Sequence, residues 1–112
     1  MPLTANVTAV TFEPADGLPD GCTRDAEGHL WVAHWGGSRV SRWNVRTGRR
    51  LQEIHLPVRN VTSCGFVGER LNQLVISTAR DEAGTPAEAE AGFVFLARPD
   101  TVGTEPTCFA GA

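Results

Sequence analysis

Short runs of β-branched, aromatic and aliphatic residues recur along the chain, separated by the turn-forming residues Gly, Pro, Asp and Asn. This pattern is typical of short β-strands joined by tight turns. It predicts strands near residues 6–12, 22–24, 30–34, 40–45, 51–56, 63–67, 73–78, 93–97 and 107–110, with turns at 14–20, 25–28, 36–38, 46–48 and 57–60. The polar stretch 80–91 contains Gly84 and Pro86, which favour an exposed loop over a helical turn.

Short strands at regular spacing indicate an all-β sandwich, barrel or propeller, and an internal repeat favours the propeller. The segment that begins at Cys22, CTRDAEGHLWVAHW, aligns with the segment that begins 42 residues later at Cys64 (64 − 22 = 42), CGFVGERLNQLVISTAR. A period of about 40 to 45 residues is that of a four-stranded propeller blade. We therefore expect one all-β domain over residues 1–112, a β-propeller fragment of about two four-stranded blades, the first at about 18–57 and the second at about 61–112.

Two local features fit this expectation. The apolar run 30–33 is expected to pack between blades, and the tryptophans Trp31, Trp35 and Trp43 are interpreted as packing residues because aromatic rings bury large apolar areas. The sequence Arg46-Thr47-Gly48 is expected to close a hairpin, in which Gly48 adopts a positive φ.

Composition narrows the classes of protein. A chain of 112 residues with 41% hydrophobic and 21% charged residues is long enough for one modest core and is not typical of a disordered protein. Its net charge of −3 argues against nucleic acid as a partner, because phosphate binding needs clustered positive charge. No apolar run is long enough to span a membrane, and the first residues lack the features of a signal peptide, so we expect a cytoplasmic protein with no membrane partner.

The cysteines do not indicate a framework of cross-links. Cys22, Cys64 and Cys108 are odd in number and widely spaced, and the chain has no C-x-x-C motif that would build a local zinc site. We expect three small buried side chains in a reducing compartment.

An ordered set of short motifs runs from about Gly17 to the end of the chain: Pro19-Asp20-Gly21, Asp25-Ala26-Glu27-Gly28, Leu30-Trp31-Val32-Ala33, Gly36-Gly37, Arg39-Val40, Thr47-Gly48, Leu56-Pro57, Thr62-Ser63-Cys64 with Phe66, Thr78-Ala79-Arg80 and Ala91-Gly92. In this order the motifs resemble the senescence-marker-protein, gluconolactonase and regucalcin-like family. The resemblance implies a six-bladed propeller, a divalent metal (calcium or zinc) in its central channel, and hydrolysis of small sugar lactones or esters. It covers only the last third of a full-length member.

The resemblance assigns a role to one residue. In the family the Asp of the Pro-Asp-Gly motif is a metal ligand and a proposed general base, and Asp20 occupies that place. Without the family, Asp20 is an ordinary turn residue on a tight turn set by Pro19 and Gly21. The other family ligands belong to upstream blades, and one carboxylate cannot hold calcium, which takes about 6 to 8 oxygens.

The repeat suggests further channel-lining residues. Thr62 and Ser63 occupy, in the second copy, the place that Asp20 and Gly21 hold in the first, so Gly21, Thr62 and Ser63 are expected to line the channel. Ser63 is not expected to be a nucleophile, because no G-x-S-x-G motif surrounds it.

Other polar residues are given structural interpretations. Asp16 is expected to be a solvated loop residue, and Asp25 and Glu27 are expected to cap a hairpin at the opposite end of the blade from Asp20. His34 ends an apolar strand and is expected to be packed or solvent-facing rather than part of a site.

Two blades cannot close a ring, and a repeat array needs about three or more units to bury a continuous core. We therefore consider a homo-oligomer, with three copies making six blades and bringing together three Asp20 carboxylates, or a separate chain that supplies the missing blades. The alternative is a non-enzymatic propeller remnant or interaction module that self-associates or docks on another chain.

Overall fold

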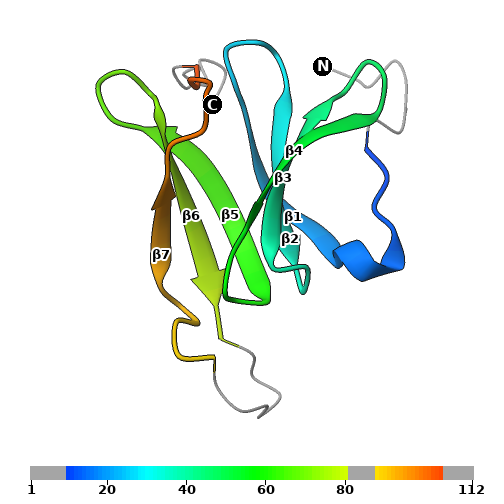
Figure 1. The fold of residues 1–112 in the computed structure, drawn as a ribbon, viewed down its shortest axis with the longest axis vertical. Helices are drawn as coiled ribbons and strands as arrows, with labels where there is room; N and C mark the ends of the chain where they lie inside the picture. The colour runs from blue at the N-terminus through cyan, green and yellow to red at the C-terminus, as the bar shows by residue number, and fades with distance from the viewer. Residues whose placement is uncertain (1–9, 81–87, 105–112) are drawn as a thin grey trace, which may run out of the picture.

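The structure is a computed structural model that describes residues 10–80 and 88–104 (Figure 1). A short 3-10 turn at Pro14–Asp16 precedes the strands β1 (Leu18–Arg24), β2 (Leu30–Trp35), β3 (Arg39–Asn44), β4 (Arg49–His55), β5 (Asn60–Val67), β6 (Gln73–Ala79) and β7 (Val94–Ala97). The predicted all-β class is confirmed. Across the described ranges, no helix is long and apolar enough to cross a membrane. The cytoplasmic location stays a prediction.

The strands form two antiparallel meanders. In the first meander β1 pairs with β2, β2 with β3 and β3 with β4; in the second meander β5 pairs with β6 and β6 with β7. The two meanders join into one sheet through a single pairing, between Trp35 on β2 and Asn60 on β5. Figure 1 shows the second meander lying beside the first, so that the interior between them comes from both.

The largest differences from the predicted elements lie before β2. Residues 10–12 are not in a strand, and the remainder of the predicted strand 6–12 lies outside the described residues, as does the predicted strand 107–110. The predicted turn at 14–20 is wrong in its second half. The chain turns at Gly17, with φ 78°, and β1 has already begun at Leu18. Pairing with β2 therefore places the Pro19-Asp20-Gly21 motif inside a strand.

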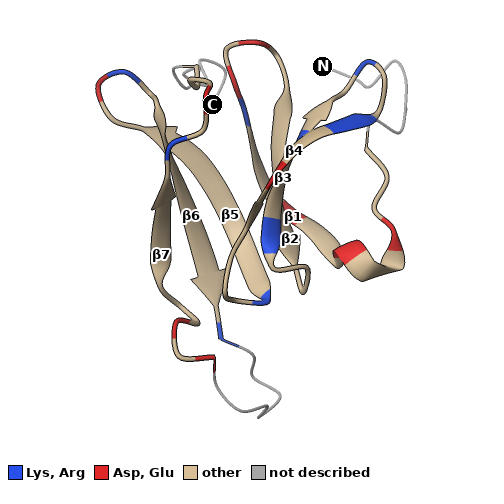
Figure 2. Cartoon of the chain, viewed as in Figure 1, with Lys and Arg blue, Asp and Glu red and all other residues tan. Residues whose placement is uncertain are grey.

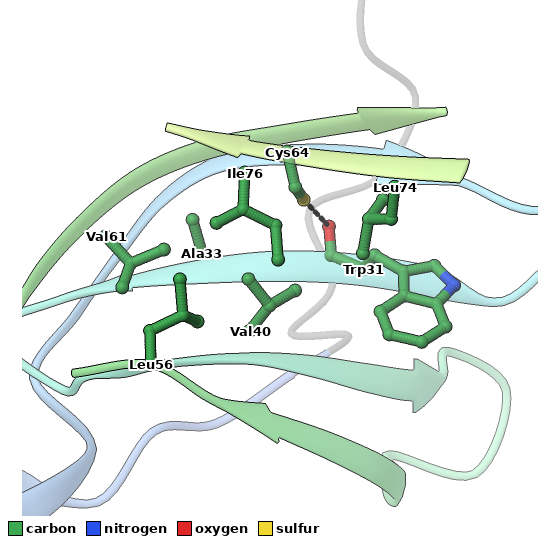
Figure 3. Close-up of a cluster of buried hydrophobic side chains, with 8 residues drawn as sticks. All are labelled: Trp31, Ala33, Val40, Leu56, Val61, Cys64, Leu74 and Ile76. Carbon is green, nitrogen blue, oxygen red and sulfur yellow. Dashed lines mark hydrogen bonds between the residues drawn. The ribbon is translucent and has the colours of Figure 1, made fainter. Parts of the chain in front are cut away.

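The hydrophobic core lies between the two meanders (Figure 3). Its buried members are Trp31 and Ala33 on β2, Val40 on β3, Leu56 just after β4, Val61 and Cys64 on β5, and Leu74 and Ile76 on β6. Side chains alternate along each strand, so one face of each meander supplies this core. The expected packing role is confirmed for Trp31 and Trp43, but Trp35 is 38% exposed.

The cysteine expectation holds for one residue and fails for another. Cys64 is buried, and this burial raises the pKa of its thiol to about 12, which keeps the thiol protonated and inert. Cys22 is exposed on β1. Cys108 lies outside the described residues.

Asp25, which follows β1, anchors the turn before β2. One carboxylate oxygen accepts hydrogen bonds from the backbone N–H groups of Glu27 (2.9 Å) and His29 (3.1 Å). The other accepts from Trp31 Nε1 (2.9 Å) and from Arg42 Nε on β3 (2.8 Å). The expected hairpin-capping role of Asp25 is confirmed, although this carboxylate is also completely buried.

Candidate functional site

Asp20 lies on a β-bulge of β1. We call β1 and β5, which begin the two meanders and contact each other, the inner strands. Pro19 pairs with His34 and Cys22 pairs with Val32, so Asp20 and Gly21 together lie opposite Ala33 alone. Bulges bend a strand and re-aim its side chains, and they are common beside active sites. Asp20 is exposed and forms no ion pair with any described residue, so its carboxylate is free to meet a ligand.

The second meander carries a matching irregularity. On β5, Val61 pairs with Thr78 and Ser63 with Ser77, so Thr62 is an extra residue in that strand. The hydroxyl of Thr62 lies 2.6 Å from that of Ser77. Thr62 and Ser63 on β5 therefore correspond in position to Asp20 and Gly21 on β1, as the sequence repeat predicted. Each of the two strands has an extra residue at this point.

Gly21 and Ser63 bring the two inner strands into contact. A Cβ atom placed on Gly21 would lie 2.4 Å from Ser63 Oγ and 2.8 Å from Ser63 Cβ. Only glycine allows β1 to approach β5 this closely. The contact fixes the bulge, and with it Asp20, at the junction of the two meanders.

We expect Gly21→Ala to lower the free energy of unfolding by about 1–3 kcal/mol, because the added methyl group must push the two strands apart. The Ser63→Gly variant removes the hydroxyl and the Cβ that the methyl group meets, so Gly21→Ala should cost clearly less in that background. Urea denaturation of the four proteins of this double-mutant cycle measures the coupling. Equal costs in both backgrounds would show that the contact does not constrain β1.

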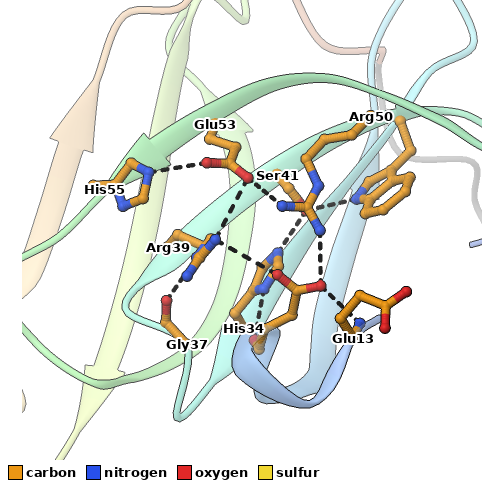
Figure 4. Close-up of polar contacts among 10 residues, drawn as sticks. Glu13, His34, Gly37, Arg39, Ser41, Arg50, Glu53 and His55 are labelled. Atoms are coloured by element: carbon orange, nitrogen blue, oxygen red, sulfur yellow. Dashed lines mark hydrogen bonds and ion pairs between the residues drawn. The ribbon is translucent and has the colours of Figure 1, made fainter. Parts of the chain in front are cut away.

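A second polar group, which we call the His34 cluster, consists of Asp16, His34, Arg39, Ser41, Trp43, Arg50 and Glu53 (Figure 4). Because His34 is adjacent along β2 to the core residue Ala33, its side chain lies on the other face of the first meander. His34 is fully buried, and its Nδ1 lies 2.8 Å from the backbone oxygen of Asp16. A carbonyl oxygen only accepts, so Nδ1 carries the proton and Nε2 accepts from the hydroxyl of Ser41 at 2.6 Å. Trp43 Nε1 donates to the same hydroxyl oxygen at 2.6 Å. His34 is therefore a packed residue, as expected.

The expectation for Asp16 is wrong, because Asp16 is buried in this cluster. Its carboxylate accepts from the backbone N–H of Glu13 (2.8 Å) and from Arg50 Nη2 (2.9 Å), and it lies 3.5 Å from Arg39 Nη1. Burial raises the pKa of Asp16, but the hydrogen bonds from Glu13 and Arg50 outweigh it, so the pKa lies below its usual value. Glu53 completes the cluster by pairing with Arg39 and Arg50.

Every charge of the His34 cluster has a partner within it, and the cluster is therefore structural.

The titration of His34 has a consequence for the stability of the protein. Burial lowers the pKa of His34 below its ordinary value of 6.5, and the cations Arg39 and Arg50 add to this, against the hydrogen bond to the Asp16 carbonyl. In the unfolded chain the imidazole gains a proton near pH 6.5, whereas in the folded chain it gains the proton only at a lower pH.

We therefore expect the stability of the protein to fall as pH drops below 6.5, by up to about 1.4 kcal/mol per pH unit from this residue. The unfolded state binds more protons in this range, so the sign favours unfolding. Urea denaturation between pH 7.5 and 5 measures the slope, which should flatten in His34→Gln and remain in His55→Gln, since His55 is exposed on β4. A slope that persists in His34→Gln would assign it to another group.

The metal that the family resemblance implies has no complete site among the described residues. Over residues 10–80 and 88–104, no group of three or more His, Cys, Asp or Glu side chains is placed to hold an ion. Asp20 offers one carboxylate, against the 6 to 8 oxygens that calcium takes. The described part of a single chain therefore does not fit the metal.

The chain is similar to a set of lactonase-type proteins. A family model described as the SMP-30/Gluconolactonase/LRE-like region matches residues 2–80. The Bacillus subtilis protein YvrE, which is named as a sugar lactone lactonase, is 41% identical over 103 residues, covering 89% of this chain and 35% of its own length. Human regucalcin is 40% identical over 104 residues, again 89% of this chain and 35% of its own length.

Two solved structures are similar to this chain and come from proteins with related names. Regucalcin from Agrobacterium tumefaciens, described as a calcium-binding protein, matches with a TM-score of 0.78 and 27% identity, over 90% of this chain and 35% of that one. A luciferin-regenerating enzyme matches with a TM-score of 0.74 and 28% identity, over 86% and 34%. These structural neighbours are β-propellers, and this chain spans about a third of their length and of the length of the curated relatives it matches. The fold is therefore a propeller fragment, as predicted.

Proposed function

The chain belongs to the SMP-30/gluconolactonase/LRE-like family, and on this premise we propose that it supplies Asp20 to the active site of a hydrolase that opens small sugar lactones or related esters. The observation that carries the proposal is the exposed Asp20 carboxylate on a bulge at the junction of the two inner strands. The family match includes this residue. The name of YvrE, a sugar lactone lactonase, supports the same substrate class.

In this proposal Asp20 is the general base. Its carboxylate accepts a proton from a water molecule as the water oxygen attacks the carbonyl carbon of the lactone. The ring C–O bond then breaks, and the proton passes to the leaving oxygen, so lactone and water give one hydroxy acid. The hydroxyl groups of Thr62 and Ser63 lie on the neighbouring inner strand, where they can hydrogen-bond to the hydroxyls of a sugar lactone.

A divalent metal, calcium or zinc, is the cofactor that we propose for the assembled site. Support comes from the regucalcin relatives, one of which is described as calcium-binding. Asp20 would be one ligand, and the remaining ligands must come from outside the described residues of one chain, so no catalytic step is assigned to the metal.

The test is a hydrolysis assay on glucono-1,5-lactone and related aldonolactones, with the chain alone, with calcium and with zinc. We expect turnover above the spontaneous rate that depends on an added divalent metal. Turnover equal to the protein-free blank under every condition would favour the alternative, a non-enzymatic propeller module.

A further inference from the structure

One face of the second meander is largely apolar and carries no charge. The sequences of β5, β6 and β7 contain no Asp, Glu, Lys or Arg, and Figure 2 shows all three strands without a charged residue. On the face that points away from the core, Val75 pairs with Leu96 and Ser77 with Val94. Val94 is 66% exposed and Leu96 is 60% exposed. A contiguous patch of this kind marks an interaction surface.

A second apolar surface lies on the opposite side of the molecule, where the chain enters β1. Residues 10–14 and 17–19 line an open groove of about 450 Å³, with apolar side chains from Val10, Phe12, Pro14, Leu18 and Pro19. Leu18 is 65% exposed. Phe12 stacks on His34 with ring centroids 4.1 Å apart, which holds this segment against the first meander. In Figure 1 this segment and β7 lie at the two sides of the molecule.

The two surfaces suit a head-to-tail contact between copies. The strands of the apolar face contain no charged residue. The groove is lined by one charged residue, Glu13, which is exposed and can stay in water when the face of another copy packs there. The chain matches 35% of the Agrobacterium propeller, so three copies account for about its whole length. A contact between two different surfaces makes a closed ring when its rotation closes.

We propose that three copies of this chain close a ring, in which the Val75, Val94 and Leu96 face of one copy packs into the groove of residues 10–19 of the next. We assign a second copy of the chain as the partner because every copy carries both surfaces, so the face of one can pack into the groove of another. A ring would direct the inner strands β1 and β5 of every copy, with their Asp20 side chains, toward one axis. It would thus bring together carboxylates that a single copy cannot.

The first measurement is the mass in solution, by light scattering after size exclusion. We expect about 36 kDa, three times the 12.0 kDa of the chain. Leu96→Asp and Leu18→Asp should each give monomers, because each places a charge in one half of the contact. Val45→Asp, the same type of change on a residue that is 38% exposed in the β3–β4 turn, should remain trimeric. Circular dichroism tests whether each variant is folded. If Leu96→Asp does not fold, Leu96→Asn replaces it in the mass measurement.

Mixing the two monomeric variants separates a head-to-tail contact from a symmetric one. The Leu18→Asp variant keeps an intact face and the Leu96→Asp variant keeps an intact groove. At high concentration the mixture should therefore form a dimer through one head-to-tail contact, with a mass of about 24 kDa. Three results would overturn the ring: a natural chain that is monomeric at every concentration, a symmetric dimer, or a mixture of the two variants that stays monomeric. The ring concerns assembly alone, so an inactive trimer would contradict only the proposed hydrolase function.

Discussion

Replacing Asp25 by Ala is expected to lower the free energy of unfolding by about 3–5 kcal/mol, a large part of the 5–15 kcal/mol that a small domain has. The carboxylate is completely buried and accepts hydrogen bonds from two backbone N–H groups, from Trp31 and from Arg42. Its removal leaves the guanidinium of Arg42, which is 13% exposed, without its closest counter-charge. Arg42 then keeps only its ion pair with the exposed Glu27, at 3.1 Å. A mostly buried charge that loses its closest partner is a costly defect.

Urea denaturation at neutral pH measures this effect. Asp25→Asn keeps the shape and loses the charge, and should fall between the natural protein and Asp25→Ala. Glu27→Ala, on the same turn with a side chain 60% exposed, should cost less than about 1 kcal/mol. If Asp25→Ala were no more harmful than Glu27→Ala, the buried ion pair would not be a determinant of stability.

The same carboxylate adds to acid sensitivity. Burial raises the pKa of Asp25, but the hydrogen bonds from Arg42, His29 and Trp31 outweigh it and lower the pKa below its ordinary value of 3.8. Its stabilising contribution is therefore present above pH 3.8 and is lost as pH falls through the folded-state pKa. This range lies well below the range in which His34 acts, so a pH titration of stability separates the two.

Asp20→Asn is expected to lower kcat/KM for lactone hydrolysis by about 100- to 10,000-fold, since the amide cannot act as a general base. Because Asp20 is exposed and forms no ion pair with a described residue, the free energy of unfolding should stay within about 0.5 kcal/mol of that of the natural protein. Initial rates on an aldonolactone, together with urea denaturation, measure both quantities.

A matched control for this variant is Asp100→Asn, which removes an exposed carboxylate from the segment after β7. It should leave both the rate and the stability unchanged. Full activity of Asp20→Asn in a preparation that hydrolyses lactones would remove Asp20 from the proposed mechanism, although the family membership would stand.

Local patterns were sufficient for the strands and several turns. Short β-branched and aromatic runs between turn residues predicted β2, β3 and β6 to within one or two residues, because such residues favour extended strands. The predicted positive φ of Gly48 is confirmed at 73°. The Pro19-Asp20-Gly21 motif was predicted as a turn, but it is a bulge. Pro, Asp and Gly are frequent in tight turns, and only the pairing of β1 with β2 distinguishes the two.

The sequence by itself determined the strand pattern, the family and the identity of the candidate carboxylate. Only the tertiary structure decided which carboxylates are buried. Asp16 and Asp20 are four residues apart and chemically identical, yet Asp16 is buried against Arg50, which lies 34 residues away in the sequence, and Asp20 is exposed. A carboxylate can leave water only where a cation and hydrogen-bond donors replace its hydration. For Asp16 one donor, the backbone N–H of Glu13, is local, but the cations Arg39 and Arg50 come from β3 and β4. No local pattern around Asp16 specifies where those two strands lie.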